Sequence, residues 1–210
     1  MELYLLPLII ALPFVAGLAA ILLPSDSRTP STWLAGFTTL VCLVSTLSLY
    51  PAVTDGQVLR YHAEWLPTLG VDFVLRMDGF AWIFAALVSG IGFLVVVYTR
   101  YYISPEDPVR RFYLYFLCFS GSMLGVVLSG NLVVMVVFWE LTSIFSFLLI
   151  GYWHHNQSAR DGARMAFTIT GIGGLSLLAG VLIIGHIVGS YDLDVVLSSG
   201  NLIRTHELYT

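Results

Sequence analysis

The chain has 210 residues, of which 58% are hydrophobic and only 10% carry a charged side chain. Soluble domains carry about 25% charged residues, so this composition excludes a soluble globular protein and indicates an integral membrane protein. The net charge is −4 and the sequence contains no run of basic residues, which argues against nucleic-acid binding. Two cysteines, Cys42 and Cys118, lie in separate apolar runs without metal-ligand spacing, so neither a metal nor a cofactor is expected.

Six stretches approach the roughly 20 apolar residues that a membrane span needs. They are residues 3–23, 33–50, 80–98, 112–128, 132–152 and 165–188. The first has no basic segment before it and is too long for the apolar part of a signal peptide, so we interpret it as a retained span. Pro13 should kink this span, and a neighbouring helix should satisfy the freed carbonyl. The sequence therefore predicts an all-α membrane protein of about six helices.

Residues 54–78 have a different pattern. The runs "VLRYHAEW" and "VDFVLRM" flank a Pro/Gly turn at residues 67–70, which predicts a small β-hairpin outside the bilayer; an irregular loop is the alternative. Asp78, in "RMDGF", is expected to cap the following helix. The chain then divides into two N-terminal helices (1–53), the hairpin (54–78), a four-helix unit (79–190) and a polar tail (191–210). The tail is expected to be a loop or a short amphipathic helix without a cap or anchor.

The distribution of positive charge predicts the orientation. The chain contains no lysine, and its nine positive residues are all arginine. Six of them fall in loops that share one face: Arg28, Arg100, Arg110, Arg111, Arg160 and Arg164. The positive-inside rule places this face in the cytoplasm and the N-terminus and hairpin outside. Residues 129–131 join two spans by a very short turn, so these spans should pack as antiparallel neighbours.

The fifth span, "VVMVVFWELTSIFSFLLIG", contains a full carboxylate near its middle. A charged group in hydrocarbon costs several kcal/mol unless it is neutralised, hydrated or paired. On a helical wheel, Glu140 falls on the same side as Trp139, Thr142, Ser143 and Ser146. The other side is apolar: Val134, Phe138, Leu141, Ile144, Phe145, Leu148 and Leu149. Such a polar face is typical of a bundle interior or a hydrated path, with Ser143 within reach of Glu140. The alternative is a neutral glutamate that only holds helices together.

Histidines and glycines supply weaker candidates. His154 and His155 follow the fifth span and could form a proton entry, or they are polar interfacial residues. His186, near the end of the sixth span, can titrate near neutral pH, although a helix-end histidine at the interface is the simpler interpretation. The glycine-rich run "TITGIGGLSLLAG" (168–180) predicts close helix approach and is not a phosphate loop.

Three segments resemble a known family. "LRMDGFAWIFAALVSGIGFLVVVYTRYYI", "SGNLVVMVVFWELTSIFSFLLIGYW" and "ARDGARMAF" are similar to the start of the antiporter-like subunits. This family includes the A subunit of Mrp-type cation/proton antiporters and the largest proton-pumping membrane subunit of complex I. The resemblance implies that Glu140 relays protons, paired with a lysine on a later helix. It also implies partners, namely membrane lipid and other small hydrophobic subunits, in a bacterial inner membrane.

Two departures from the family refine this hypothesis. Gly171 and Gly174 stand where the complex I branch has an arginine and an aspartate, which favours the antiporter branch. Family members have about fourteen helices, whereas this chain has six spans and no lysine, so we expect it to be the N-terminal part of a longer subunit. The function predicted is exchange of Na⁺ or K⁺ for H⁺. The alternatives are a proton-pumping subunit of a redox complex and a scaffold that does not transport.

Overall fold

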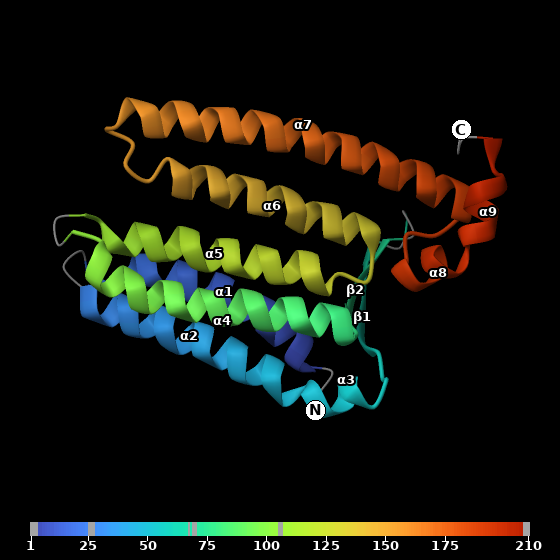
Figure 1. The fold of residues 1–210 in the computed structure, drawn as a ribbon, viewed down its shortest axis with the longest axis horizontal. Helices are drawn as coiled ribbons and strands as arrows, with labels where there is room; N and C mark the ends of the chain where they lie inside the picture. Colours follow the sequence, from blue (N-terminus) through green and yellow to red (C-terminus); the bar gives the residue numbers. More distant parts are fainter. Residues whose placement is uncertain (1–3, 25–27, 67, 69–70, 105–106, 208–210) are drawn as a thin grey trace.

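The computed structural model describes residues 4–24, 28–66, 68, 71–104 and 107–207. Its long helices run side by side in Figure 1, and the sheet lies at one end of them. The elements, in chain order, are α1 (Leu5–Leu22), α2 (Arg28–Ser48), α3 (Tyr50–Thr54), β1 (Leu59–Leu66), β2 (Val71–Met77), α4 (Gly79–Tyr102), α5 (Val109–Leu128), α6 (Leu132–Ile150), α7 (Gln157–Val188), α8 (Leu193–Ser198) and α9 (Gly200–Thr205). Among the described residues, six helices are long and apolar enough to cross a membrane, which confirms the predicted number. Helices α1, α2, α4 and α5 pack together, α6 packs on α5, and α7 packs on α6.

Helix α7 is longer than its apolar stretch, because it begins at Gln157 rather than near Met165. The Asn156 side chain accepts a hydrogen bond from the Ser158 N–H at 2.9 Å, which caps the helix. The Gln157 amide donates to the Asp161 carboxylate one turn later. The first two turns of α7 consist mainly of polar residues, so the hydropathy pattern does not detect that they are helical.

Pro13 lies inside α1 and has a partner on α2 for the carbonyl that it frees. A proline has no N–H, so the carbonyl four residues earlier, at Ile9, loses its hydrogen bond within the helix. The buried Cys42 thiol of α2 lies 3.6 Å from the Ile9 oxygen and donates to it. Cys42 thus acts as a small apolar residue that also satisfies a backbone acceptor.

Strands β1 and β2 form the predicted antiparallel hairpin, with Arg60 opposite Arg76. Most of the predicted turn at residues 67–70 lies outside the described residues. Asp78 caps α4 as expected, because its carboxylate accepts from the Ala81 N–H at 2.8 Å.

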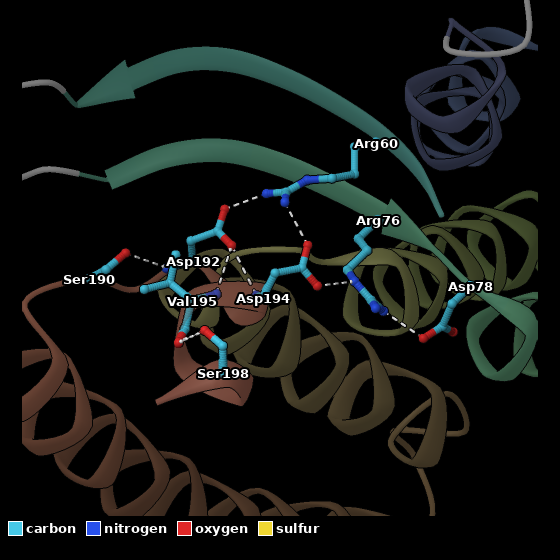
Figure 2. A network of polar contacts seen from close by, with 8 residues as sticks. All are labelled: Arg60, Arg76, Asp78, Ser190, Asp192, Asp194, Val195 and Ser198. Atoms are coloured by element: carbon cyan, nitrogen blue, oxygen red, sulfur yellow. Dashed lines mark hydrogen bonds and ion pairs between the residues drawn. The ribbon is translucent and has the colours of Figure 1, made fainter. Parts of the chain in front are cut away.

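The tail is paired with the hairpin, a contact that the sequence did not predict. Figure 2 shows Arg60 paired with Asp192 and Asp194, and Arg76 paired with Asp194 and Asp78. The Arg76 side chain is only 15% exposed and its Nε lies 2.7 Å from Asp194. Sequence patterns did not reveal the pairs with Asp192 and Asp194, because these partners stand more than 100 residues apart.

Asp78 is a charged anchor at neutral pH. Burial raises the pKa of its carboxyl, but the Ala81 N–H and the Arg76 guanidinium outweigh this effect and leave the pKa below its ordinary value. A lowered pKa in the folded state contributes stability that is present above the unfolded value, about 3.9, and lost as pH falls through the folded value.

The turn between α5 and α6 is tied to both the hairpin and the tail. The Gly130 N–H donates to the Val74 carbonyl at 2.8 Å, and the Gly130 carbonyl accepts from the Leu193 N–H at 2.9 Å. The Leu132 N–H donates to the Tyr191 carbonyl at 2.9 Å. The hairpin, the α5–α6 turn and the tail are far apart in the sequence and meet at one end of the bundle. We call it the hairpin end.

At the opposite end, which we call the arginine end, arginines satisfy the last carbonyls of three helices. Arg110 donates to the Leu23 carbonyl after α1, and Arg28 donates to the Arg100 and Ile103 carbonyls at the end of α4. Arg111 donates to the Tyr152 carbonyl after α6 at 2.7 Å. Helix C-termini leave carbonyls without partners and carry a partial negative charge, so cations stabilise them.

Helices α5 and α6 are neighbours, as the short turn predicted, and one glycine sets their contact. A Cβ atom at Gly125 would lie only 2.3 Å from Cδ1 of Phe138. Phe138 is 9% exposed and belongs to the main apolar cluster of the bundle. The missing side chain at Gly125 therefore makes room for the ring.

We expect Gly125→Ala to destabilise the fold by about 1–3 kcal/mol, because the Phe138 ring has to shift within a packed core. Gly180→Ala is the matched control, since a Cβ atom there meets nothing within 4 Å. Denaturant unfolding in detergent micelles measures both. Equal stability of the two variants would contradict the packing described.

We expect Arg76→Gln to loosen α8 and α9, because the variant removes one of the two arginine partners of Asp194 and the arginine partner of Asp78. Amide hydrogen exchange across residues 193–205 should accelerate about tenfold, equivalent to about 1.4 kcal/mol. Arg204→Gln removes the same charge from an exposed site on α9 and should leave the exchange unchanged. Unchanged exchange in the Arg76 variant would show that the pairs do not hold the tail.

We predict that the arginine end faces the cytoplasm. A cysteine at Pro108, which is exposed beside Arg110, should react with a membrane-impermeant maleimide only from the cytoplasm, and a cysteine at Gln57 only from outside. The native Cys42 and Cys118 are 2% and 3% exposed, so background labelling should be low. Labelling of the Pro108 variant from outside would reverse the topology.

Candidate functional site

Glu140 lies in the middle of α6, eight residues after its first residue and ten before its last. The Glu140 side chain is partly buried, and its Oε1 atom is fully buried. Within the part of the chain that the structure describes, Oε1 has no hydrogen-bond partner. An unpaired carboxylate oxygen in an apolar setting is costly unless it carries or exchanges a proton or is hydrated.

The apolar side of α6 packs on the rest of the bundle. Val134 and Phe138 belong to the main apolar cluster and Leu141 packs against it. The Phe145 ring lies 6.3 Å from the ring of Phe14 on α1. Because this side is occupied by α1 and α5, the opposite side, with Glu140, faces α7.

Three contacts set the antiparallel register of α6 against α7. Glu140 meets Gly174, where an added Cβ would lie 1.6 Å from Oε1. The Phe147 and Phe167 rings lie 5.3 Å apart, and an added Cβ at Gly151 would lie 3.5 Å from the Ala163 methyl. This register places Ser143 opposite Gly171. Of these two glycines, Gly174 contacts α6, whereas an added Cβ at Gly171 would meet nothing within 4 Å.

Apolar contacts lie on both sides of the carboxyl group along the α6–α7 interface. Toward the hairpin end, Leu132 and Val136 pack on Val181. Toward the arginine end, the Phe147–Phe167 ring pair follows one to two turns later. The carboxyl group is thus confined between α6 and α7.

The described structure shows no hydrogen bond from a predicted hydroxyl partner to Glu140. Ser143 is buried, and its hydroxyl donates to the Trp139 carbonyl at 3.3 Å instead of to Glu140. Thr142 donates to the same carbonyl at 2.6 Å. Hydroxyls in helices commonly bond the carbonyl one turn earlier, which explains the difference. Ser146 is partly buried one turn beyond Thr142.

A cavity of about 280 Å³ opens at the arginine end, between α5, α6 and α7. It is lined by Arg111, Tyr115, Phe147, Leu148, Gly151, His154, Arg160, Ala163 and Arg164. His154 Nδ1 lies 3.1 Å from a guanidinium nitrogen of Arg111. Arginine can only donate, so Nδ1 accepts here and a proton on the neutral ring sits on Nε2. Beside the cavity, burial and the nearby Asp107 raise the pKa of Tyr152 to about 12.

The other two candidate histidines, His155 and His186, have no described contact with Glu140. His155 is exposed next to His154, with ring centroids 6.0 Å apart. His186 is exposed in the last turn of α7, about 18 Å of helix rise from Gly174. Glu140, Thr142, Ser143 and Ser146 thus lie within two turns of α6, whereas His186 lies at the hairpin end. In the described ranges no group of three or more His, Cys, Asp or Glu could hold a metal ion.

Sequence reasoning missed the glycine that contacts Glu140. It gave the whole run 168–180 one role, close helix approach. In the structure, Gly174 makes such an approach, while an added Cβ at Gly171, Gly173 or Gly180 meets nothing within 4 Å. The seven-residue spacing that links Glu140 to Phe147 and Gly174 to Phe167 is the signal that could have aligned the two helices.

Comparisons with known proteins agree on one family. A family model described as "NADH:quinone oxidoreductase/Mrp antiporter, TM" matches residues 129–207. A second, described as "NADH-Ubiquinone oxidoreductase (complex I), chain 5 N-terminus", matches residues 65–113.

Two curated relatives and one solved structure extend these matches. One relative is the A/B subunit of a probable K⁺/H⁺ antiporter of Rhizobium meliloti (strain 1021). The two sequences are 62% identical, and the match covers 98% of this chain and 20% of the relative. This chain is also 36% identical, over 91% of its length, to 24% of the A subunit of an Na⁺/H⁺ antiporter of Alkalihalophilus pseudofirmus. In the solved Mrp complex from Dietzia sp. DQ12-45-1b, 22% of one chain matches 97% of this chain, with a TM-score of 0.82 and 28% identity. The chain thus spans about a fifth to a quarter of the length of these relatives.

Proposed function

Since the chain belongs to the NADH:quinone oxidoreductase/Mrp antiporter family of membrane subunits, we propose that it forms part of a subunit that exchanges Na⁺ or K⁺ for protons. Glu140 is the group that carries the proton. The observation that supports this role is its buried Oε1 atom, which has no hydrogen-bond partner among the described residues and lies between two membrane helices.

An unpaired carboxyl oxygen suits proton relay. It takes up a proton without breaking an existing hydrogen bond, and it releases the proton without moving a fixed partner. Burial favours the neutral form of a carboxyl group, whereas a nearby cation favours the charged form. Approach and departure of a cation can therefore drive uptake and release.

The cavity at the arginine end is the proposed entry for protons. Phe147 lines this cavity and lies about 10 Å of helix rise from Glu140, and Ser143 lies between them on the same side of α6. Ser143 donates to Trp139, so its oxygen remains able to accept a hydrogen bond. His154 lies in the wall of the cavity, and the Phe147–Phe167 pair separates the cavity from the carboxyl group. His186, at the other end of α7, belongs to the exit side.

The relatives guide the choice of cation and partners. The 62% identical relative is named for K⁺/H⁺ exchange and the 36% identical one for Na⁺/H⁺ exchange, so both ions have to be tested. Other hydrophobic subunits of a complex in a bacterial inner membrane are the proposed partners, together with membrane lipid.

The match of residues 65–113 to complex I chain 5 supports a second candidate, a proton-pumping subunit of a redox complex. The two candidates differ in what drives proton movement. Purification of the assembled complex separates them, because flavin and iron–sulfur subunits should accompany only the redox form.

We predict that Glu140→Gln abolishes most cation-dependent proton movement while assembly survives. Glutamine keeps the shape of the side chain and most of its hydrogen-bonding capacity but carries no titratable proton. Glu140→Asp should retain part of the activity, because a carboxyl group remains. Fluorescence of a pH-sensitive dye in inverted vesicles that contain the whole complex, with Na⁺ or K⁺ added, measures the rate.

Glu64→Gln is the matched control, because Glu64 is an exposed carboxylate on β1. It should transport at the parental rate. If the Glu140→Gln complex assembles and also transports at the parental rate, the proton role is wrong. If it fails to assemble, Glu140 is a structural residue and the scaffold alternative gains support.

A further inference from the structure

We propose that Gly174 is a positioning residue for Glu140, which means that its missing side chain gives the carboxyl group its place against α7. The effect that we expect on transport rests on the proposed function of Glu140. The geometry of the contact stands without that function.

The contact between Glu140 and α7 leaves no room for a Cβ atom at position 174. An ideal Cβ atom at Gly174 would lie 1.6 Å from Oε1 of Glu140 and 2.7 Å from its carboxyl carbon. Both distances are far below van der Waals contact, so alanine at this position and the observed carboxyl position exclude each other. Gly174 is one of only four buried residues of α7 among those described, with Ala163, Val181 and Gly185.

The backbone does not require glycine at this position. In the described part of the chain only Gly56 and Gly189 have positive φ, whereas Gly174 lies in the middle of a regular helix. Glycine in a helix interior costs about 1 kcal/mol relative to alanine. Propensity therefore favours alanine at position 174, and the carboxyl group of Glu140 is what excludes it.

The position of the contact also explains the unpaired oxygen. In the middle of a helix the backbone N–H groups are already bonded to carbonyls one turn earlier. A carboxyl group that lies against this part of α7 therefore meets a helix backbone with no donor to offer. Gly174 lets the group approach while leaving its oxygen free to exchange a proton.

Alanine at position 174 should move the carboxyl group without unfolding the protein. The atoms in the way are the end of a flexible side chain, which can rotate aside. The helix itself gains propensity. Gly174→Ala thus displaces the carboxyl group while both helices remain, and Gly173→Ala is the control, because a Cβ atom there meets nothing within 4 Å.

Two measurements on the whole complex test the proposal. The first is cation-dependent proton movement in inverted vesicles, which Gly174→Ala should lower at least about tenfold. The second is the rate at which dicyclohexylcarbodiimide, an apolar reagent for protonated carboxyl groups, labels the peptide that contains Glu140. Displacement from α7 should raise this rate severalfold. Gly173→Ala should change neither, and Glu140→Gln should remove the labelling.

Combination with a shorter carboxylate gives the sharper test. Glu140→Asp withdraws the carboxyl group by one methylene, about 1.5 Å, so that most of its overlap with a Cβ atom at position 174 is removed. We expect the Glu140→Asp/Gly174→Ala complex to transport faster than the Gly174→Ala complex. If its loss equals the product of the two single losses, the residues act independently and the proposal is wrong.

The remaining outcomes separate this proposal from the proposed function. Unchanged transport and unchanged labelling in Gly174→Ala overturn the positioning role while leaving Glu140 as the proton carrier. Loss of assembly in Gly174→Ala also contradicts it, since the side chain is expected to move aside. Normal transport in Glu140→Gln combined with altered labelling in Gly174→Ala shows that the proton role fails and the positioning contact is real.

Discussion

The constraint that shapes this protein is that hydrocarbon offers no hydrogen bonds, so polar groups in the spans need partners within the protein. The structure meets it repeatedly with local solutions. Cys42 serves the carbonyl that Pro13 frees, and hydroxyls such as those of Thr46 and Ser122 bond carbonyls one turn earlier on their own helices. Against this background Glu140 stands apart, because it is the one carboxylate among the buried unpaired side-chain atoms of the described residues. Its unpaired state reflects its placement between helices rather than poor packing of the bundle.

Sequence alone predicted what depends on local pattern. Apolar length predicted the six spans and alternation predicted the hairpin. A lone carboxylate in an apolar run made Glu140 the candidate site, and its role stays a prediction. Sequence analysis failed where the determining contact joins residues far apart in the chain or involves a residue without a side chain. The first turns of α7 are polar, so hydropathy missed them, although Asn156 caps them. Asp194 pairs with arginines more than 100 residues away. Gly174 has no side chain, so its role becomes visible only when the register against α6 is known.

The arginines illustrate how one pattern can have two physical causes. Their concentration at one end predicts a cytoplasmic face through the positive-inside rule. In the structure the same residues donate to carbonyls at the ends of α1, α4 and α6. These are the helices that end at that face, so the arginines also balance the negative ends of their dipoles. Helix capping alone accounts for Arg28, Arg110 and Arg111, whereas Arg164 is exposed and is better explained by membrane orientation.

The packing of α6 against α7, and not a hydrogen-bond donor, positions the carboxyl group of Glu140, and this has a mechanical consequence. The carboxyl group of Glu140 occupies a position defined by the distance and register between α6 and α7, which are held by Val136 and Val181 on one side and by the Phe147–Phe167 pair on the other. A sliding of α7 along α6 that places a residue with a side chain opposite Glu140 would displace the carboxyl group. Two packed helices interlock in discrete arrangements, so such a shift is a change between two states and not a continuous one. At the hairpin end, the tail that follows α7 pairs with Arg60 and Arg76. Helix α7 therefore connects these ion pairs with the proposed proton site on α6.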